Sequence, residues 1–133
     1  MITKNDMMGP ILEASPRFVP VWEAFLKYCK SEAVDLPLYL VLGDLAGHIA
    51  SLIQEGAEAE LQRLFSVVEA WHVEGDDYVR NAATVGLLED LQNASVVAPV
   101  DPANIVRFLG PESKRWWVKV ERFWRYGELI RDD

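Results

Sequence analysis

Residues 57–93 read AEAELQRLFSVVEAWHVEGDDYVRNAATVGLLEDLQN and hold two helical patterns separated by an acidic turn. In the first pattern, residues 57–72, apolar side chains recur every three or four positions, as on one face of a helix. In the second, residues 78–93, apolar side chains spread almost all round the helix, so we expect this helix to be the most buried. Gly75 ends the first pattern, and the stretch therefore predicts a helical hairpin.

The same periodicity continues on both sides of this hairpin. One pattern opens at Ser15 and reaches Cys29, and Pro20 either begins or kinks that helix. Three further helices are predicted over residues 35–54, 102–109 and 111–127. The spacing of Gly43 and Gly47, one turn apart, predicts that a neighbouring helix comes close there. We expect an all-α, compact bundle of five or six helices.

The length of 133 residues fits one domain, residues 1–133, with its own core. We expect flexible ends over residues 1–14 and 128–133 and an extended linker over residues 94–101, with an edge strand as the alternative for that linker. The single Cys29 has no internal partner for a disulfide and is expected to be a buried small hydrophobe. With no signal peptide in MITKNDMMGP and no apolar run long enough to span a membrane, the sequence predicts a cytoplasmic protein.

Charge is distributed unevenly along the chain. The net charge is −8, but residues 32–106 alone carry thirteen acidic and two basic side chains, a balance of −11, while the two flanks are slightly positive. Such a surface repels nucleic acid and anionic membranes and attracts basic partners. We therefore expect a protein partner, with neither nucleic acid nor membrane bound.

No arrangement of residues in the sequence is typical of catalysis or metal binding. Asp44, His48 and Ser51 lie along one line of a straight helix, where they do not converge as a hydrolytic triad does, so a solvated stripe is expected. Glu69 and His72 have the spacing of half a di-metal site, and the second half is missing. The sequence predicts no catalytic residue, no metal and no cofactor.

The last helix has a basic face opposite its aromatic face. Because the aromatic side chains are expected in the core, they are not available to interleave with the charges as in nucleic-acid binding. The basic face is expected to be solvated, or to pair with the acidic middle of the chain.

Two groups of carboxylates exceed what the helices need. Glu89 and Asp90 lie near the carboxyl end of a helix, where negative charge opposes the helix dipole, so they either pair with the basic last helix or face a cationic partner. The turn after Glu74 carries more acidic residues than helix capping uses. The predicted partner-binding residues are Glu69, Glu74, Asp76, Asp77, Glu89 and Asp90.

A resemblance to known proteins rests on three stretches. Asp76, Val79, Arg80 and Ala83 give the D-x-x-V-R-x-x-A spacing of a HEAT-like helical hairpin. Together with LYLVLGDLAGHI before it and FLGPESKRWWVKVERFW after it, the chain from about 15 to 127 resembles small all-helical bacterial proteins associated with polymorphic-toxin immunity. The resemblance implies an immunity protein, a cytoplasmic inhibitor that binds its cognate toxin and blocks the active site. Many such toxins are basic nucleases, which the acidic middle of the chain would attract.

Two other classes of function stay open at this stage. One is a small enzyme with a pocket at Asp44 and His48, which requires a concave site and a perturbed histidine pKa. The other is a structural subunit of a larger helical assembly. A homodimer would be compatible with either an inhibitor or a subunit.

Overall fold

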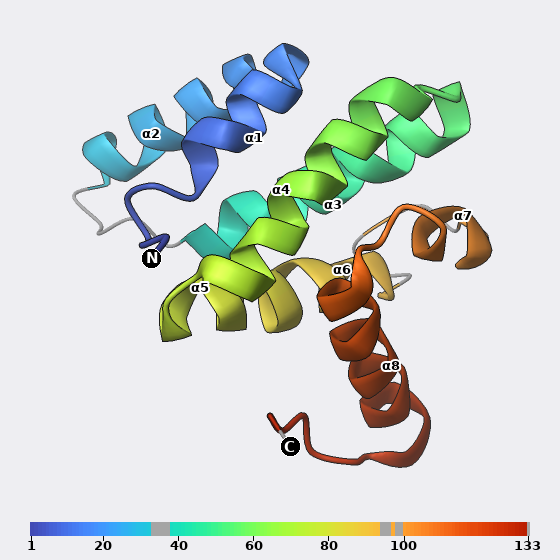
Figure 1. Ribbon diagram of the computed structural model, residues 1–133. Coiled ribbons are helices and arrows are strands. Elements are labelled where there is room, and N and C mark those ends of the chain that lie inside the picture. The colour runs from blue at the N-terminus through green and yellow to red at the C-terminus, as the bar shows by residue number, and fades with distance from the viewer. Residues whose placement is uncertain (33–37, 94–96, 98–99, 133) are drawn as a thin grey trace.

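The chain is all-helical in the computed structural model, which describes residues 1–32, 38–93, 97 and 100–132 (Figure 1). Its α-helices are α1 Met8–Ala14, α2 Val19–Ser31, α3 Leu38–Glu55, α4 Glu58–Glu74, α5 Asp77–Asn81, α6 Glu89–Leu91, α7 Ala103–Val106 and α8 Pro111–Tyr126. A 3-10 turn, η1, covers Pro16–Phe18, and a π-helical segment, η2, covers Ala82–Leu88. Since α5, η2 and α6 are continuous, they form one helix over residues 77–91, which we call the central helix. The described residues thus form seven separate α-helices and no strand, which confirms the all-α class.

The central helix is the most enclosed part of the fold, as its apolar pattern predicts. α3, α4 and α8 all pack against it, and its small residues Ala82, Ala83 and Gly86 are buried. At Gly86 a Cβ atom would lie 2.8 Å from Cδ1 of Leu42, so the absence of a side chain there lets α3 come close.

The helices α3 and α4 form an antiparallel hairpin beside the central helix (Figure 1). Gly56, with φ of +79°, lies in the left-handed region and ends α3 at the predicted place. Gly43 lies 3.5 Å from a carboxylate oxygen of Asp90, measured from an added Cβ, whereas nothing lies within 4 Å at Gly47. Among the described residues, the neighbour expected at both glycines is therefore present at Gly43, in ordinary van der Waals contact, and not at Gly47.

The amino-terminal segment, predicted to be flexible over residues 1–14, is partly helical. Residues 8–14 form α1, which packs against α4, and the side chains of Met7, Met8 and Ile11 are buried. The indole Nε1 of Trp71 donates a hydrogen bond to the carbonyl oxygen of Met7 at 3.1 Å. Apolar spacing over positions 7, 8, 11 and 14 was the available signal for this helix.

The sequence also predicted features of α2, of the start of α3 and of the linker over residues 94–101. Pro20 is the second residue of α2, so it begins that helix and does not kink it, and Cys29 is buried. The first residues of the helix predicted over 35–54, up to residue 37, lie outside the described residues. So does most of the expected 94–101 linker, of which the structure describes Val97, which is buried, and residues 100 and 101.

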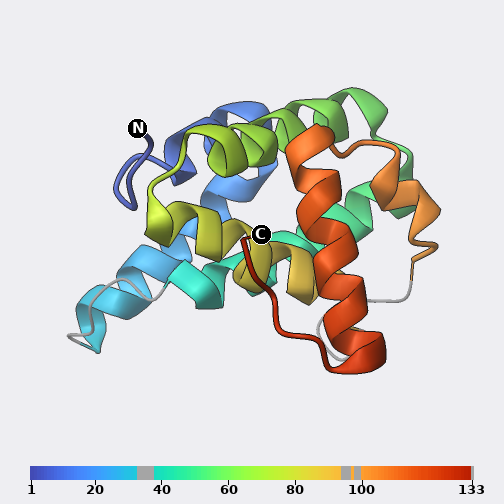
Figure 2. The same cartoon turned by 60° about the horizontal axis from the view of Figure 1, so that its bottom comes forward.

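The last helix begins at Pro111 and ends at Gly127, whose φ of +70° is left-handed. After Gly127 the chain turns back along α8 without helical structure (Figure 2). Side chains of this segment contact α8. The carboxyl end was expected to be flexible, but over residues 128–132 it lies against the helix. Of the helices described, none combines the length and apolar character needed to cross a membrane.

Candidate functional site

The structure separates the six predicted partner-binding carboxylates into three places. Glu74, Asp76 and Asp77 lie at the turn before the central helix, and Glu89 and Asp90 lie near its other end. Asp77 is the first residue of the central helix and Glu89 lies near its last turn, so the two are at opposite ends of it. Glu69 lies on α4, where it contacts the start of α8. A single contact area therefore does not hold all six.

The turn at residues 74–77 combines exposed and engaged carboxylates. The Asp76 side chain accepts a hydrogen bond from the backbone N–H of Val79 at 2.9 Å and caps the central helix. The backbone of Ile2 pairs with this turn, because its N–H donates to the Glu74 carbonyl at 2.8 Å and its carbonyl accepts from the Asp76 N–H at 2.9 Å. Glu74 and Asp77 are exposed and remain available to a partner.

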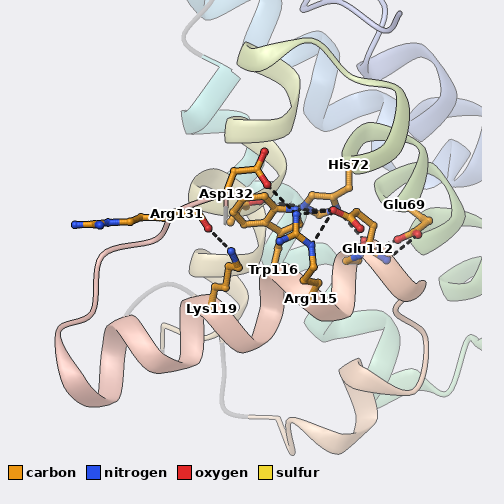
Figure 3. A network of polar contacts seen from close by, with 10 residues as sticks. Glu69, His72, Glu112, Arg115, Trp116, Lys119, Arg131 and Asp132 are labelled. Carbon is orange, nitrogen blue, oxygen red and sulfur yellow. Dashed lines mark hydrogen bonds and ion pairs between the residues drawn. The ribbon is translucent and has the colours of Figure 1, made fainter.

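Glu69 serves the fold as a cap for α8 (Figure 3). Its two carboxylate oxygens accept hydrogen bonds from the backbone N–H groups of Glu112, at 3.0 Å, and Ser113, at 2.9 Å. Burial opposes ionisation of Glu69, but these hydrogen bonds outweigh it and hold the pKa of the carboxyl below its usual value. A Cβ at Gly110 would lie 2.4 Å from Cδ of Glu69, so this approach requires glycine.

Glu89 and Asp90 are adjacent carboxylates without a compensating cation among the described residues. Both are half-buried, and burial raises the pKa of each carboxyl, with a further increase at Asp90 from the charge of Glu89. Within the described ranges, neither carboxylate accepts a hydrogen bond or joins an ion pair. The pairing with basic residues of the last helix, one of the two expected arrangements, is not formed there.

Residues of α3 lie next to the part of the central helix that carries Glu89 and Asp90. Gly43 lies next to Asp90, and the ring of Tyr39 lies against Gly86, one turn before Asp90. We call Tyr39, Gly43, Glu89 and Asp90 the acidic seam. The exposed side chains of Leu40 and Asp44 follow Tyr39 and Gly43 directly in the sequence. The seam thus combines the part-exposed ring of Tyr39 with the carboxylates of Glu89 and Asp90.

Three other acidic side chains of the middle segment pair with arginines from distant parts of the chain. Arg17 pairs with Glu55 at 3.0 Å and with Glu60 at 2.7 Å. Arg107 pairs with Glu58 at 2.6 Å. The balance of −11 in the sequence therefore overstates the field at this end of the α3–α4 hairpin.

His48 is half-buried in a cluster with Ser15 and Glu60, and therefore does not belong to the solvated stripe that was expected. Its Nε2 atom is 2.8 Å from Oγ of the buried Ser15, and the same Oγ donates to the carboxylate of Glu60. Burial lowers the pKa of His48. A hydrolytic triad places the imidazole between carboxylate and hydroxyl, whereas here the hydroxyl lies between the other two groups. Asp44, one turn before His48 on α3, is exposed.

The second histidine belongs to a buried polar network that sequence reasoning missed. Nδ1 of His72 lies 2.8 Å from Oγ of Ser113, and Nε2 lies 3.0 Å from Oγ1 of Thr84. The pKa of His72 is lowered to about 4, chiefly because burial disfavours the charged ring. Glu69 and His72 have the sequence spacing of half a metal site. Glu69 contacts α8, whereas His72 contacts both α8 and the central helix. Across the described residues, no three His, Cys, Asp or Glu side chains converge as metal ligands.

A cleft of about 460 Å³ lies between α8 and the segment that leads to α7. Its walls are mostly apolar and include Leu91, Val100, Ile105, Trp117 and Trp124. The aromatic face of α8 was expected to be core, and Trp117 is buried, but Trp124 is half-exposed at this cleft.

Comparison with known proteins gives one assignment. No curated protein and no solved structure matches the chain. A family model does match, over residues 8–125, which include every helix from α1 to the last turn of α8. The chain therefore belongs to the family described as Domain of unknown function (DUF7674).

Proposed function

We propose that the protein is a binding protein that inhibits a basic protein partner through the acidic seam. The observation that carries this proposal is the pair Glu89 and Asp90, which is half-buried without a compensating cation or hydrogen bond in the described chain. Desolvated and unpaired carboxylates destabilise a fold, and a partner's lysine or arginine would remove that cost on binding.

The composition of the seam supports a protein as the partner. Carboxylates on the same seam as the part-exposed ring of Tyr39 offer both charge and apolar contact to a partner protein. Negative charge on this face would also speed the encounter with a basic partner. Glu74 and Asp77 offer a second acidic contact at the other end of the central helix, which a domain-sized partner would reach. Glu69 and Asp76 are committed to helix capping and leave the set of proposed contacts.

The resemblance described above narrows the proposed partner. In an immunity protein of a toxin-producing bacterium, the partner is the cognate toxin, and an acidic surface suits a toxin that is a basic effector domain. Under this proposal the protein acts in the cytoplasm, one molecule binding one toxin, and contributes no catalytic group of its own.

The test is co-expression with the products of the two genes that flank the gene for this chain. We expect one product to arrest growth when expressed alone, and the wild-type chain to restore growth. The double variant Glu89→Gln/Asp90→Asn should bind that product more weakly by about tenfold or more, since each lost charge pair costs 1 kcal/mol or more. The affinity of the wild-type chain should fall as salt is raised.

The matched control is Glu55→Gln/Glu58→Gln, which removes two exposed charges that already have arginine partners. This control should protect growth as well as the wild-type chain does. Protection that is equally strong in the seam variant, or an affinity that is indifferent to salt, would count against the proposal. So would the finding that neither flanking product is toxic or bound.

A further inference from the structure

A second charged surface, of opposite sign, lies on α8 and is covered by the chain itself. After Gly127 the segment 128–132 runs back along α8 (Figure 2). Glu128, Arg131 and Asp132 contact Arg122, Lys119 and Arg115 in turn. Figure 3 shows the contacts of Arg131 and Asp132. We call 128–132 the strap. The order of contacts shows that the strap lies antiparallel to the helix.

The carboxylate of Asp132 lies in a basic site formed by side chains of two helices, α8 and the central helix. We call this site, and the similar one at Arg122, a seat. Arg115 donates to it at 2.9 Å, and Lys119 and Arg80 contribute positive charge from α8 and the central helix. The hydrogen bond from Arg115 and these charges hold the pKa of Asp132 below its usual value. The ring of Trp116 forms part of the seat, with the Arg115 guanidinium 4.8 Å and the Lys119 ammonium 4.9 Å from its centroid.

Glu128 occupies a second seat at Arg122. Two parallel hydrogen bonds, of 2.7 Å and 2.8 Å, join the guanidinium to both carboxylate oxygens. This bidentate geometry is specific for a carboxylate or a phosphate group. The ammonium of Lys119, between the two seats, donates to the backbone carbonyl of Arg131. The surface therefore contacts both the side chains and the backbone of a peptide segment.

The strap itself is held weakly. Its side chains are exposed, Leu129 by 68%, and only Ile130 is partly buried against the core. Exposed ion pairs contribute about 0–1 kcal/mol each, because solvent and salt screen them. The seats, in contrast, are fixed on helices. A competitor with the same charges could therefore displace the strap without unfolding the domain.

We propose that the basic face of α8 is a docking surface for an extended acidic segment of a partner protein, and that the strap occupies it in the free chain. The strap shows the chemistry that the surface accepts, which is two carboxylates four residues apart on a non-helical segment. The surface is distinct from the acidic seam, and the inference does not depend on the proposed function. The net charge of −8 disfavours nucleic acid as the occupant.

The test uses the full chain with the variant Glu128→Gln/Asp132→Asn, which releases the seats, and a fluorescent peptide of residues 127–133, GELIRDD. By fluorescence polarisation, this variant should bind the peptide at least about tenfold more tightly than the wild-type chain, whose own strap competes at high effective concentration. Adding Arg115→Gln and Arg122→Gln to the variant should abolish binding. The matched control peptide, GQLIRNN, should not bind.

Two results would overturn the inference: equal binding of both peptides, or binding that survives loss of Arg115 and Arg122. Tighter binding of a labelled DNA oligonucleotide than of the acidic peptide would overturn it in favour of nucleic acid. A second measurement needs no change to the strap. High concentrations of the unlabelled peptide should shift the indole N–H resonance of Trp116 in the wild-type chain, and the absence of a shift would also refute the proposal.

Discussion

The Nδ1 atom of His72 lies 2.8 Å from Oγ of Ser113, and this contact joins α4 to α8 inside the fold. Thr84 of the central helix contacts the other ring nitrogen, so three helices meet at one imidazole. Since hydroxyl groups both donate and accept, they satisfy a neutral ring, which has one donor and one acceptor.

Stability should fall in mild acid because of His72. Its pKa is about 4 in the folded chain against 6.5 for a free side chain, so between these values the unfolded chain binds more protons. The stabilisation is complete above pH 6.5 and is lost as the pH falls towards 4, by about 3 kcal/mol at 1.36 kcal/mol per pKa unit. Urea unfolding at a series of pH values measures this slope.

The variant His72→Gln separates this effect from other acid-sensitive groups. It should be less stable than the wild-type chain at neutral pH and show a shallower slope between pH 6.5 and 4. The matched control is His48→Gln, which leaves His72 in place and should keep most of the slope, although burial lowers the pKa of His48 too. An unchanged slope in His72→Gln would show that other groups cause the acid sensitivity.

The cap that Glu69 provides for α8 should be measurable. Glu69→Gln removes the charge that faces two backbone N–H groups at a helix start and should lower the free energy of unfolding by about 1–2 kcal/mol at neutral pH. Glu74→Gln, at an exposed position on the same helix, should change it by less than about 0.5 kcal/mol. Equal effects of the two substitutions would contradict the capping role.

Two glycines within helices should respond in opposite directions to alanine. At Gly47 nothing lies within 4 Å of an added Cβ, so Gly47→Ala should stabilise the fold by about 0.5–1 kcal/mol through lower chain entropy. At Gly86 the Cβ would lie 2.8 Å from Leu42, and Gly86→Ala should destabilise the fold by about 1–3 kcal/mol. Thermal unfolding compares them directly, and stabilisation by both would show that α3 is packed less closely on the central helix.

Neutralising the acidic seam should stabilise the isolated chain. Because burial raises the pKa of Asp90, its charged form is disfavoured in the fold, and it also opposes the helix dipole. Asp90→Asn should therefore raise the free energy of unfolding at neutral pH by about 0.3–1 kcal/mol, an increase that shrinks as the pH falls and Asp90 protonates. The control Asp44→Asn, at an exposed position, should have a smaller effect. A destabilised Asp90→Asn would mean that the carboxylate has a role inside the fold.

The sequence predicted the helices whose ends carry strong signals. Gly56 and Gly75 end α3 and α4, and Asp76 caps the central helix, as their residue types indicate. The helix α1 was missed because Gly9 and Pro10 suggest a break. Pro10 lies in the first turn of α1, where a backbone N–H has no helical partner to lose, so the helix tolerates it.

The candidate site was less predictable, because its state depends on partners far away in the sequence. Glu69 and Glu89 have the same side chain, yet one accepts two backbone hydrogen bonds from α8 and the other accepts none within the described chain. Arg17 reaches carboxylates some forty positions away. Helical periodicity gives the face on which a residue lies but not which distant element meets that face.

The π-helical segment Ala82–Leu88 also determines the direction in which the end of the central helix points. Its wider turns change the angular phase of every residue that follows, relative to an ordinary helix with about 3.6 residues per turn. Rewinding the same seven residues as an ordinary α-helix, without any deletion, would rotate Glu89 and Asp90 by about 100° around the helix axis. A change of winding alone would thus re-aim the binding surface, although none of its side chains had been replaced.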